Sequence, residues 1–370
     1  MNSAVNNKQI NTTMRILTGI AIIQVVMGHL DFDVLSIGGL FPYYSFHVMV
    51  FVFVSGYFYK PEYESGVLKY VGKKALHLLV PYYIWNLIYG IISTILNIYG
   101  YTYTQKITPM NFLIEPFLGG HQYGLNFAAW FIPALFLIEV INILIRKILT
   151  YLKLNKDIFI LVVTLILGVA CVYLAQTGHV WGWYKTPGRI LFMLPVYEMG
   201  RVYHIYVEIY ENKISGYVMM PIIVCIQLAL IMIADGAINF SAVWCTGFAS
   251  WPIMPYLTII TGTLFWIRVS RFLAQTGRCR LLEAIGADSF GICMHHVAIF
   301  FLINTLTMAI CNLVKPAYAF DMNQYISDVN YVYMVGGIYA WKLVYATLAI
   351  AGSILISRIS KKLVKKVQKV

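Results

Sequence analysis

Two neighbouring stretches, GIAIIQVVMGHL at residues 19–30 and SFHVMVFVFVSGYFY at residues 45–59, decide how this chain folds. Both are almost continuously apolar and lack the alternation of apolar and polar residues that marks a half-buried strand. The first stretch closes with His29, and His47 stands near the start of the second. An ionisable side chain inside a bilayer is costly, so one that persists usually has a partner or a function. The two histidines therefore predict a shared polar site near one membrane surface.

The composition of the whole chain agrees with membrane insertion. Of its 370 residues, 60% are hydrophobic and 11% are charged, whereas soluble domains carry about 25% charged residues. Ten apolar runs are each about long enough to cross a hydrocarbon core as an α-helix: 14–31, 44–60, 76–98, 128–147, 157–176, 188–204, 215–235, 250–268, 285–311 and 337–357. The expected fold class is therefore all-α, a polytopic membrane helix bundle of about ten transmembrane helices.

The positive charges predict which side of the membrane each loop faces. Of the 27 Lys and Arg residues, 22 lie in one alternating set of loops and tails and 5 in the other. The positive-inside rule places the richer set, which includes both termini, in the cytoplasm. We expect a cytoplasmic segment 1–13, a transmembrane domain 14–357 and a basic cytoplasmic tail 358–370. The net charge of +12 follows from this asymmetry, so no nucleic-acid partner is expected.

Features outside the apolar runs narrow the function. The N-terminal segment lacks the charged region and cleavage site of a signal peptide, so the first helix is expected to stay attached. The longest outer segments, 99–127 and 312–336, are rich in Tyr and Asn, which allows short interfacial helices or a lid. The six cysteines form no CxxC pair and the eight histidines have no metal-ligand spacing, so no metal is expected.

Arg15 and His29 belong to the same predicted helix. At about 100° and 1.5 Å per residue, they lie within about 40° of one helix face and about 21 Å apart. A bound molecule could lie along this helix, with an anionic head at Arg15 inside and a reactive end at His29 outside. In the alternative interpretation Arg15 anchors the helix at the cytoplasmic interface, and His29 touches water or lipid headgroups.

Other intramembrane polar residues have two interpretations each. Ser55 lies about 80° around the helix from His47, and Gly56 beside it would let another helix approach closely, so Ser55 is a site residue or part of a packing notch. His295 and His296 point about 100° apart, so both cannot face one site, and one of them bonds a neighbouring helix.

Three further charged residues lie in apolar runs. Glu139 falls in the middle of its run, where a lone carboxylate is costly, so we expect a cationic or hydroxyl partner. Glu198 is expected to form a local i,i+3 ion pair with Arg201. Arg189 opens the run 188–204 at the outer face, where it either holds an anionic or sugar-bearing acceptor or anchors the helix.

Five motifs resemble those of the acyltransferase-3 family, integral membrane acyltransferases that include bacterial polysaccharide O-acetyltransferases. GIAIIQVVMGH resembles the family's first-helix signature, which ends in histidine, and FHVMVFVFVSGY its second-helix pattern. VPYYIWN and WFIPALF resemble the third- and fourth-helix patterns. SFGICMHH resembles a late helix that ends in histidine, with His296 at the family position. The order of these motifs covers nearly the whole membrane region, 14–357.

The resemblance implies a function and a site. Relatives move an acyl group, usually acetyl from acetyl-CoA, onto a carbohydrate or glycolipid hydroxyl at the outer side of the cell membrane. It implies that His29 is the essential histidine, as general base or in an acyl relay, with His47 in support. The family's arginine would fall near Thr18, and Arg15, one turn earlier, is the candidate for binding CoA. The alternatives are a polysaccharide or glycolipid exporter and a structural subunit of an envelope-synthesis complex.

Overall fold

The computed structural model describes residues 2–249, 251–314 and 319–367. These residues contain no β-strand, only an isolated bridge between Ser241 and Thr246. Among them, eight helical stretches are long and apolar enough to cross a membrane. The predicted all-α polytopic bundle is therefore confirmed.

All ten predicted runs form helices, although two do not meet the length and composition expected of a membrane span. The eight that do are built on α1 (Asn2–His29), α3 and α4 (Val67–Lys74 and Val80–Ile98, joined by the π-helical turn η3, Ala75–Leu79), α6 (Phe131–Tyr151), α7 (Asp157–Gln176), α10 (Gly216–Ile233), α11 (Met254–Thr276), α13 (Ser289–Val314) and α15 (Trp341–Val367). Of the other two, α2 (His47–Tyr57) has only 11 residues. The other exception, α8 (Lys185–Val202), has four charged residues, Lys185, Arg189, Glu198 and Arg201, which is more than a typical membrane span carries.

Two predicted boundaries differ from the structure. The run 285–311 is divided at Asp288, between α12 (Arg280–Ala287) and α13. The Asp288 carboxylate accepts hydrogen bonds from Arg358 and Lys361 of α15, at 3.1 and 2.8 Å, which fixes the break against another helix. The run 250–268 starts later, at Met254, because prolines suit a first helical turn, where the missing N–H would have no partner. Residue 250 itself lies outside the described residues.

The two segments that we expected to lie outside the membrane contain short helices, one of the two possibilities that their composition allowed. Residues 315–318 of the second segment lie outside the described part of the chain. The first segment holds η4 (Met110–Ile114), α5 (Glu115–Leu118) and the start of η5 (Gly124–Trp130), and the second holds α14 (Met322–Ser327) and most of η8 (Val335–Gly337). Short elements elsewhere in the chain are η1 (Tyr43–Ser45), η2 (Pro61–Gly66), η6 (Gly182–Tyr184), η7 (Tyr203–Val207) and α9 (Glu208–Glu211).

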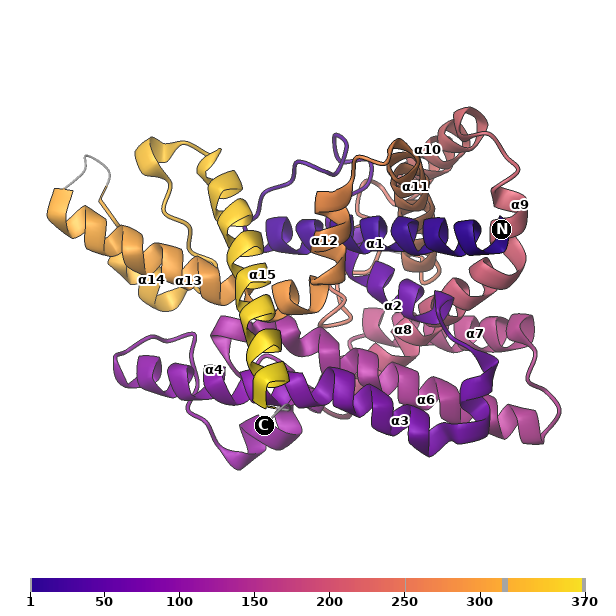
Figure 1. The fold of residues 1–370 in the computed structure, drawn as a ribbon, viewed down its shortest axis with the longest axis horizontal. Helices are drawn as coiled ribbons and strands as arrows, with labels where there is room; N and C mark the ends of the chain where they lie inside the picture. The colour runs from indigo at the N-terminus through magenta and orange to yellow at the C-terminus, as the bar shows by residue number, and fades with distance from the viewer. Residues whose placement is uncertain (1, 250, 315–318, 368–370) are drawn as a thin grey trace.

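Glycines allow the closest helix crossings. In Figure 1, α2 lies between α1 and α8 and contacts both. A Cβ atom added to Gly56 of α2 would collide with the carbonyl group of Tyr197 in α8, and one added to Gly200 would collide with that of Phe53. Small residues let helix backbones approach in this way. Gly56 is therefore the packing notch that the sequence suggested.

A buried ion-pair network joins α6, α7 and α8. Arg146 of α6 pairs with Glu198 of α8 and lies 2.9 Å from Asp157 of α7. Arg201 pairs with Asp157 instead, at 2.6 Å. The predicted local pair between Glu198 and Arg201 is therefore wrong. The planar guanidinium of Arg146 serves two carboxylates from different helices at once, a geometry that sequence spacing along one helix does not reveal.

Candidate active site

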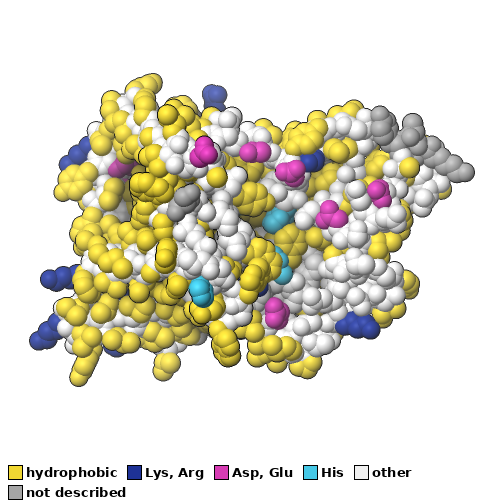
Figure 2. Space-filling model, turned by 180° about the vertical axis from the view of Figure 1, so that it is seen from behind, with side chains coloured by type: hydrophobic (Ala, Val, Ile, Leu, Met, Phe, Trp, Pro, Cys, Tyr) yellow, Lys and Arg dark blue, Asp and Glu magenta, His cyan; other side chains and the backbone are white. Residues whose placement is uncertain are grey.

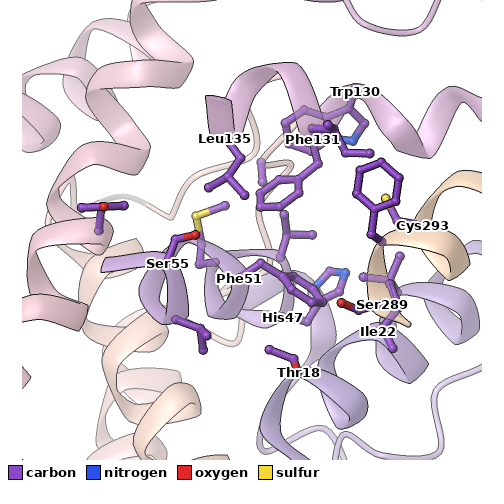
Figure 3. Close-up of a pocket in the computed structure, with 18 of the residues that line it drawn as sticks. Thr18, Ile22, His47, Phe51, Ser55, Trp130, Phe131, Leu135, Ser289 and Cys293 are labelled. Atoms are coloured by element: carbon purple, nitrogen blue, oxygen red, sulfur yellow. The ribbon is translucent and has the colours of Figure 1, made fainter. Parts of the chain in front are cut away.

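A cavity of about 470 Å³ lies where α1, α2, α6 and α13 meet. Its volume falls in the range of small-molecule sites, about 300–1,000 Å³. The wall is mostly apolar with a few polar groups, which is also typical of such sites. Figure 3 shows the side chains that border it: Thr18 and Ile22 from α1, His47, Phe51 and Ser55 from α2, Phe131 and Leu135 from α6, and Ser289 and Cys293 from α13. Histidine side chains are visible near the middle of the molecular face in Figure 2.

His29 lines this cavity and is stacked on His296. The ring centroids are 5.2 Å apart, with 28° between the ring planes. The Nδ1 atom of His296 lies 2.7 Å from the carbonyl oxygen of Ile292, so Nδ1 carries the proton and donates it. The Nε2 atom of His296 is then unprotonated, and it has no partner among the described residues. The fold thus brings the last residue of α1 against α13 about two turns from its start, and places His296 beside the predicted essential histidine.

His47 is buried in the same cavity wall. Its Nδ1 donates to the carbonyl oxygen of Tyr43, one helical turn earlier. Its ring lies 5.3 Å from that of Tyr44, whose hydroxyl donates to the carbonyl of Gly28 at 3.0 Å. Since Gly28 precedes His29, this bond ties the start of α2 to the end of α1. The two histidines of the opening motifs therefore line one cavity, as a shared site requires.

A fourth histidine, His121, lies close to His29 and was missed by the sequence analysis. Its ring is 5.3 Å from that of Phe127, which in turn lies 4.9 Å from the ring of His29. His121 and His47 are near enough for a charge on either to act on His29. A single histidine in an outer segment has no spacing signal, and only the packing of Phe127 between the rings of His121 and His29 brings it there. Among the described residues, no three His, Cys, Asp or Glu side chains are arranged to hold a metal ion.

Ser55, two turns after His47 on α2, donates a hydrogen bond to the ion pair between Lys74 and Glu139. Lys74 and Ser55 both line the cavity, and both donate to Oε1 of Glu139, at 2.6 and 3.1 Å. Glu139 is only 1% exposed and Lys74 is 32% exposed. The prediction that Glu139 has a cationic or hydroxyl partner is confirmed, since it has one of each. The charge pattern of the sequence placed Lys74 only in a cytoplasmic loop, so its position in the cavity wall was not predicted.

The protein-family comparison agrees with this geometry. A family model described as an acyltransferase domain matches residues 13–358. The chain belongs to the acyltransferase-3 family. It is therefore an acyltransferase, and its apolar helices make it a membrane protein. No curated protein and no solved structure matches the chain.

In this acyltransferase, Arg15 lies beside the cavity but not in its wall. Its side chain is exposed and borders a smaller hollow of about 260 Å³. Val54 and Phe58 of α2 line both this hollow and the main cavity. Arg15 is therefore next to the Thr18 end of the cavity, far along α1 from His29.

Arg189 was a candidate for binding the acceptor, but its side chain lies outside the cavity wall. It is 3% exposed, does not line the cavity, and its Nη2 donates to the carbonyl oxygens of Gly119 and Val243, at 3.2 and 2.7 Å. The acyltransferase uses this side chain to tie two loops together.

His295 points in a different direction from its neighbour His296 and lies 2.8 Å from the hydroxyl of Tyr89 in α4. This agrees with the angle of about 100° between adjacent side chains of a helix.

Proposed function

We propose that this acyltransferase moves an acyl group, acetyl in the simplest case, from cytoplasmic acyl-CoA to a hydroxyl of a cell-envelope or exported glycan. The enzyme would work in the plasma membrane of a bacterium. The observation that supports the proposal is one cavity with His29, which is stacked on His296, at one end and Lys74 at the other. Family membership supports acyl transfer over the exporter alternative.

His29 suits the role of general base. No hydrogen bond from the described residues engages its ring nitrogens, so the imidazole is free to accept a proton from a substrate hydroxyl. As that proton leaves, the hydroxyl oxygen attacks the thioester carbonyl, the C–S bond breaks, and the CoA thiolate takes the proton back from the imidazolium. A positioned base of this kind contributes about 10²–10⁴ in rate. Neutral imidazole is the side chain best suited to this role near neutral pH.

The opposite end of the cavity suits the donor. Its α1 wall runs from Thr18 to His29, about 16 Å along the helix axis. This length favours a long, narrow group such as the pantetheine arm of CoA. Lys74 and Arg15 lie towards the Thr18 end, where their positive charges would attract the CoA phosphates. Glu139 orients Lys74 rather than touching the donor itself.

The test is transfer of labelled acetyl from acetyl-CoA to surface glycan in membranes that contain equal amounts of each variant. His29→Ala is expected to lower labelling at least about 100-fold, because the base is lost. His77→Ala is the matched control, since His77 is exposed, does not line the cavity, and has Nδ1 2.8 Å from the carbonyl of Lys73.

Two results would overturn the proposal. Normal labelling by a well-folded His29→Ala variant would remove His29 from the chemistry. A wild type that transfers no acyl group from acetyl-, succinyl- or longer acyl-CoA, but moves glycan across vesicle membranes, would support the exporter.

A further inference from the structure

A row of aromatic rings from three separate segments leads from His29 to the protein surface. Beyond Phe127 and His121, the row continues to Trp244, whose ring lies 4.8 Å from that of His121. Trp181 follows, with its ring centroid 5.5 Å from that of Trp244. Trp181 is 58% exposed, so the row ends in solvent or at the membrane surface. These residues come from 119–127, from 181–185 and from the loop around 241–246.

Buried Arg189 fixes the two loops that carry the middle of this row. It binds the carbonyl of Val243, which precedes Trp244, and the carbonyl of Gly119, two residues before His121. Val243 also lines the main cavity. The loop that forms part of the cavity wall at Val243 therefore also carries Trp244. Arg189 in this way fixes the position of Trp244 relative to the cavity that holds His29.

Lys185 places a hydrogen-bond donor beside both indole rings. Its Nζ lies 4.1 Å from the ring centroid of Trp244 and 5.5 Å from that of Trp181. Aromatic faces with a few fixed polar groups are typical of specific small-molecule sites. A pyranose ring offers the matching surfaces, because one face of C–H groups can lie on an indole while its hydroxyls accept from an ammonium group. Exposed tryptophans also occur singly at membrane interfaces. Trp183 is of that kind, at 95% exposure.

We propose that Trp181, Trp244 and Lys185 form a sugar-binding subsite for the acceptor glycan. The proposal rests on the proposed function, because it requires a carbohydrate acceptor. His121 and Phe127 stand between the subsite and His29, so the pyranose seated on the tryptophans is a different sugar unit of the glycan from the one that is acylated. Burial lowers the pKa of His121 to about 4, so its imidazole is uncharged at neutral pH.

The test uses the full-length protein in lipid nanodiscs with labelled acetyl-CoA and two acceptors. One acceptor is the glycan fraction released from the host surface, and the other is glycerol, which has hydroxyls but no ring face. Trp181→Ala and Trp244→Ala are each expected to raise KM for the glycan about threefold to tenfold. The kcat at saturating glycan, KM for acetyl-CoA and the rate with glycerol should stay unchanged. Trp183→Ala is the matched control and should behave as wild type.

The outcomes separate this proposal from the proposed function. An unchanged glycan KM in both tryptophan variants, or an equal loss with glycerol, would overturn the subsite. Because Trp244 is half-buried and its loss could disturb folding, exposed Trp181 provides the second variant. Should the wild type transfer no acetyl at all, the proposed function fails, and titration of intrinsic tryptophan fluorescence with the same glycan still tests the subsite. A wild-type response that Trp181→Ala and Trp244→Ala abolish supports it, and no wild-type response refutes it.

Discussion

At the scale of single residues, His29 and His296 are two stacked imidazoles that differ in their hydrogen bonds. The Nδ1 proton of His296 is committed to the carbonyl of Ile292, while the ring of His29 has no hydrogen bond among the described residues. A neutral neighbour whose Nε2 lone pair has no hydrogen-bond partner among the described residues can stabilise an imidazolium that forms beside it. We therefore assign His296 as a positioning residue for His29. The kinetics of a variant can distinguish this role from a purely structural one.

His296→Gln is expected to lower kcat about tenfold to 100-fold with little change in KM for acetyl-CoA, and to alter the pH dependence of kcat. His295→Gln is the matched control, since it removes the contact with Tyr89 on a face of α13 about 100° away from His296. Loss of that buried contact should cost about 1–3 kcal/mol of stability without changing kcat in the folded protein. Equal falls in kcat that follow thermal stability in both variants would show that His296 only holds the fold.

At the scale of helices, the crossing of α2 and α8 determines where the site residues lie. Gly56→Ala would drive a methyl group into the backbone of Tyr197, and α2 also carries His47 and Ser55. We expect a loss of about 1–3 kcal/mol in stability together with a loss of transfer activity. Gly72→Ala in α3, where an added Cβ meets no atom within 4 Å, should be neutral or stabilise the helix by up to about 1 kcal/mol. Thermal unfolding in detergent and the acetyl-transfer assay measure both effects, and tolerance of Gly56→Ala would contradict the crossing.

The sequence could predict the helices and one half of the site, for physical reasons that these elements illustrate. Long apolar runs have few alternatives to a helix in a membrane, so all ten runs are helical. His29 and His47 could be paired because consecutive helix ends meet at the same side. The break at Asp288 depends on Arg358 and Lys361 of another helix, which no local pattern contains. His121 and Lys74 reach the cavity only through tertiary packing, and the same is true of the pair between Arg146 and Glu198.

At the scale of the whole molecule, the charge asymmetry predicts that both termini lie in the cytoplasm. Fluorescent reporters that mature only in the cytoplasm are expected to report there when fused to either terminus. A fusion after Gly178, which follows α7 and has open space around it, should be dark, because that loop is predicted to lie outside. The opposite pattern would turn the Lys74 end of the cavity away from the cytoplasmic pool of acyl-CoA, and would contradict the direction of transfer.

The ion pair between Lys74 and Glu139 has a consequence for the biosynthesis of the chain. Glu139 leaves the ribosome 65 residues after Lys74. A helix that enters the bilayer with an uncompensated charge near its centre pays roughly 3 kcal/mol. The span that contains Glu139 therefore inserts more favourably when the earlier helix is still held beside the translocon and supplies its ammonium group. Replacement of Lys74 would thus affect how efficiently α6 is inserted, before any substrate is met.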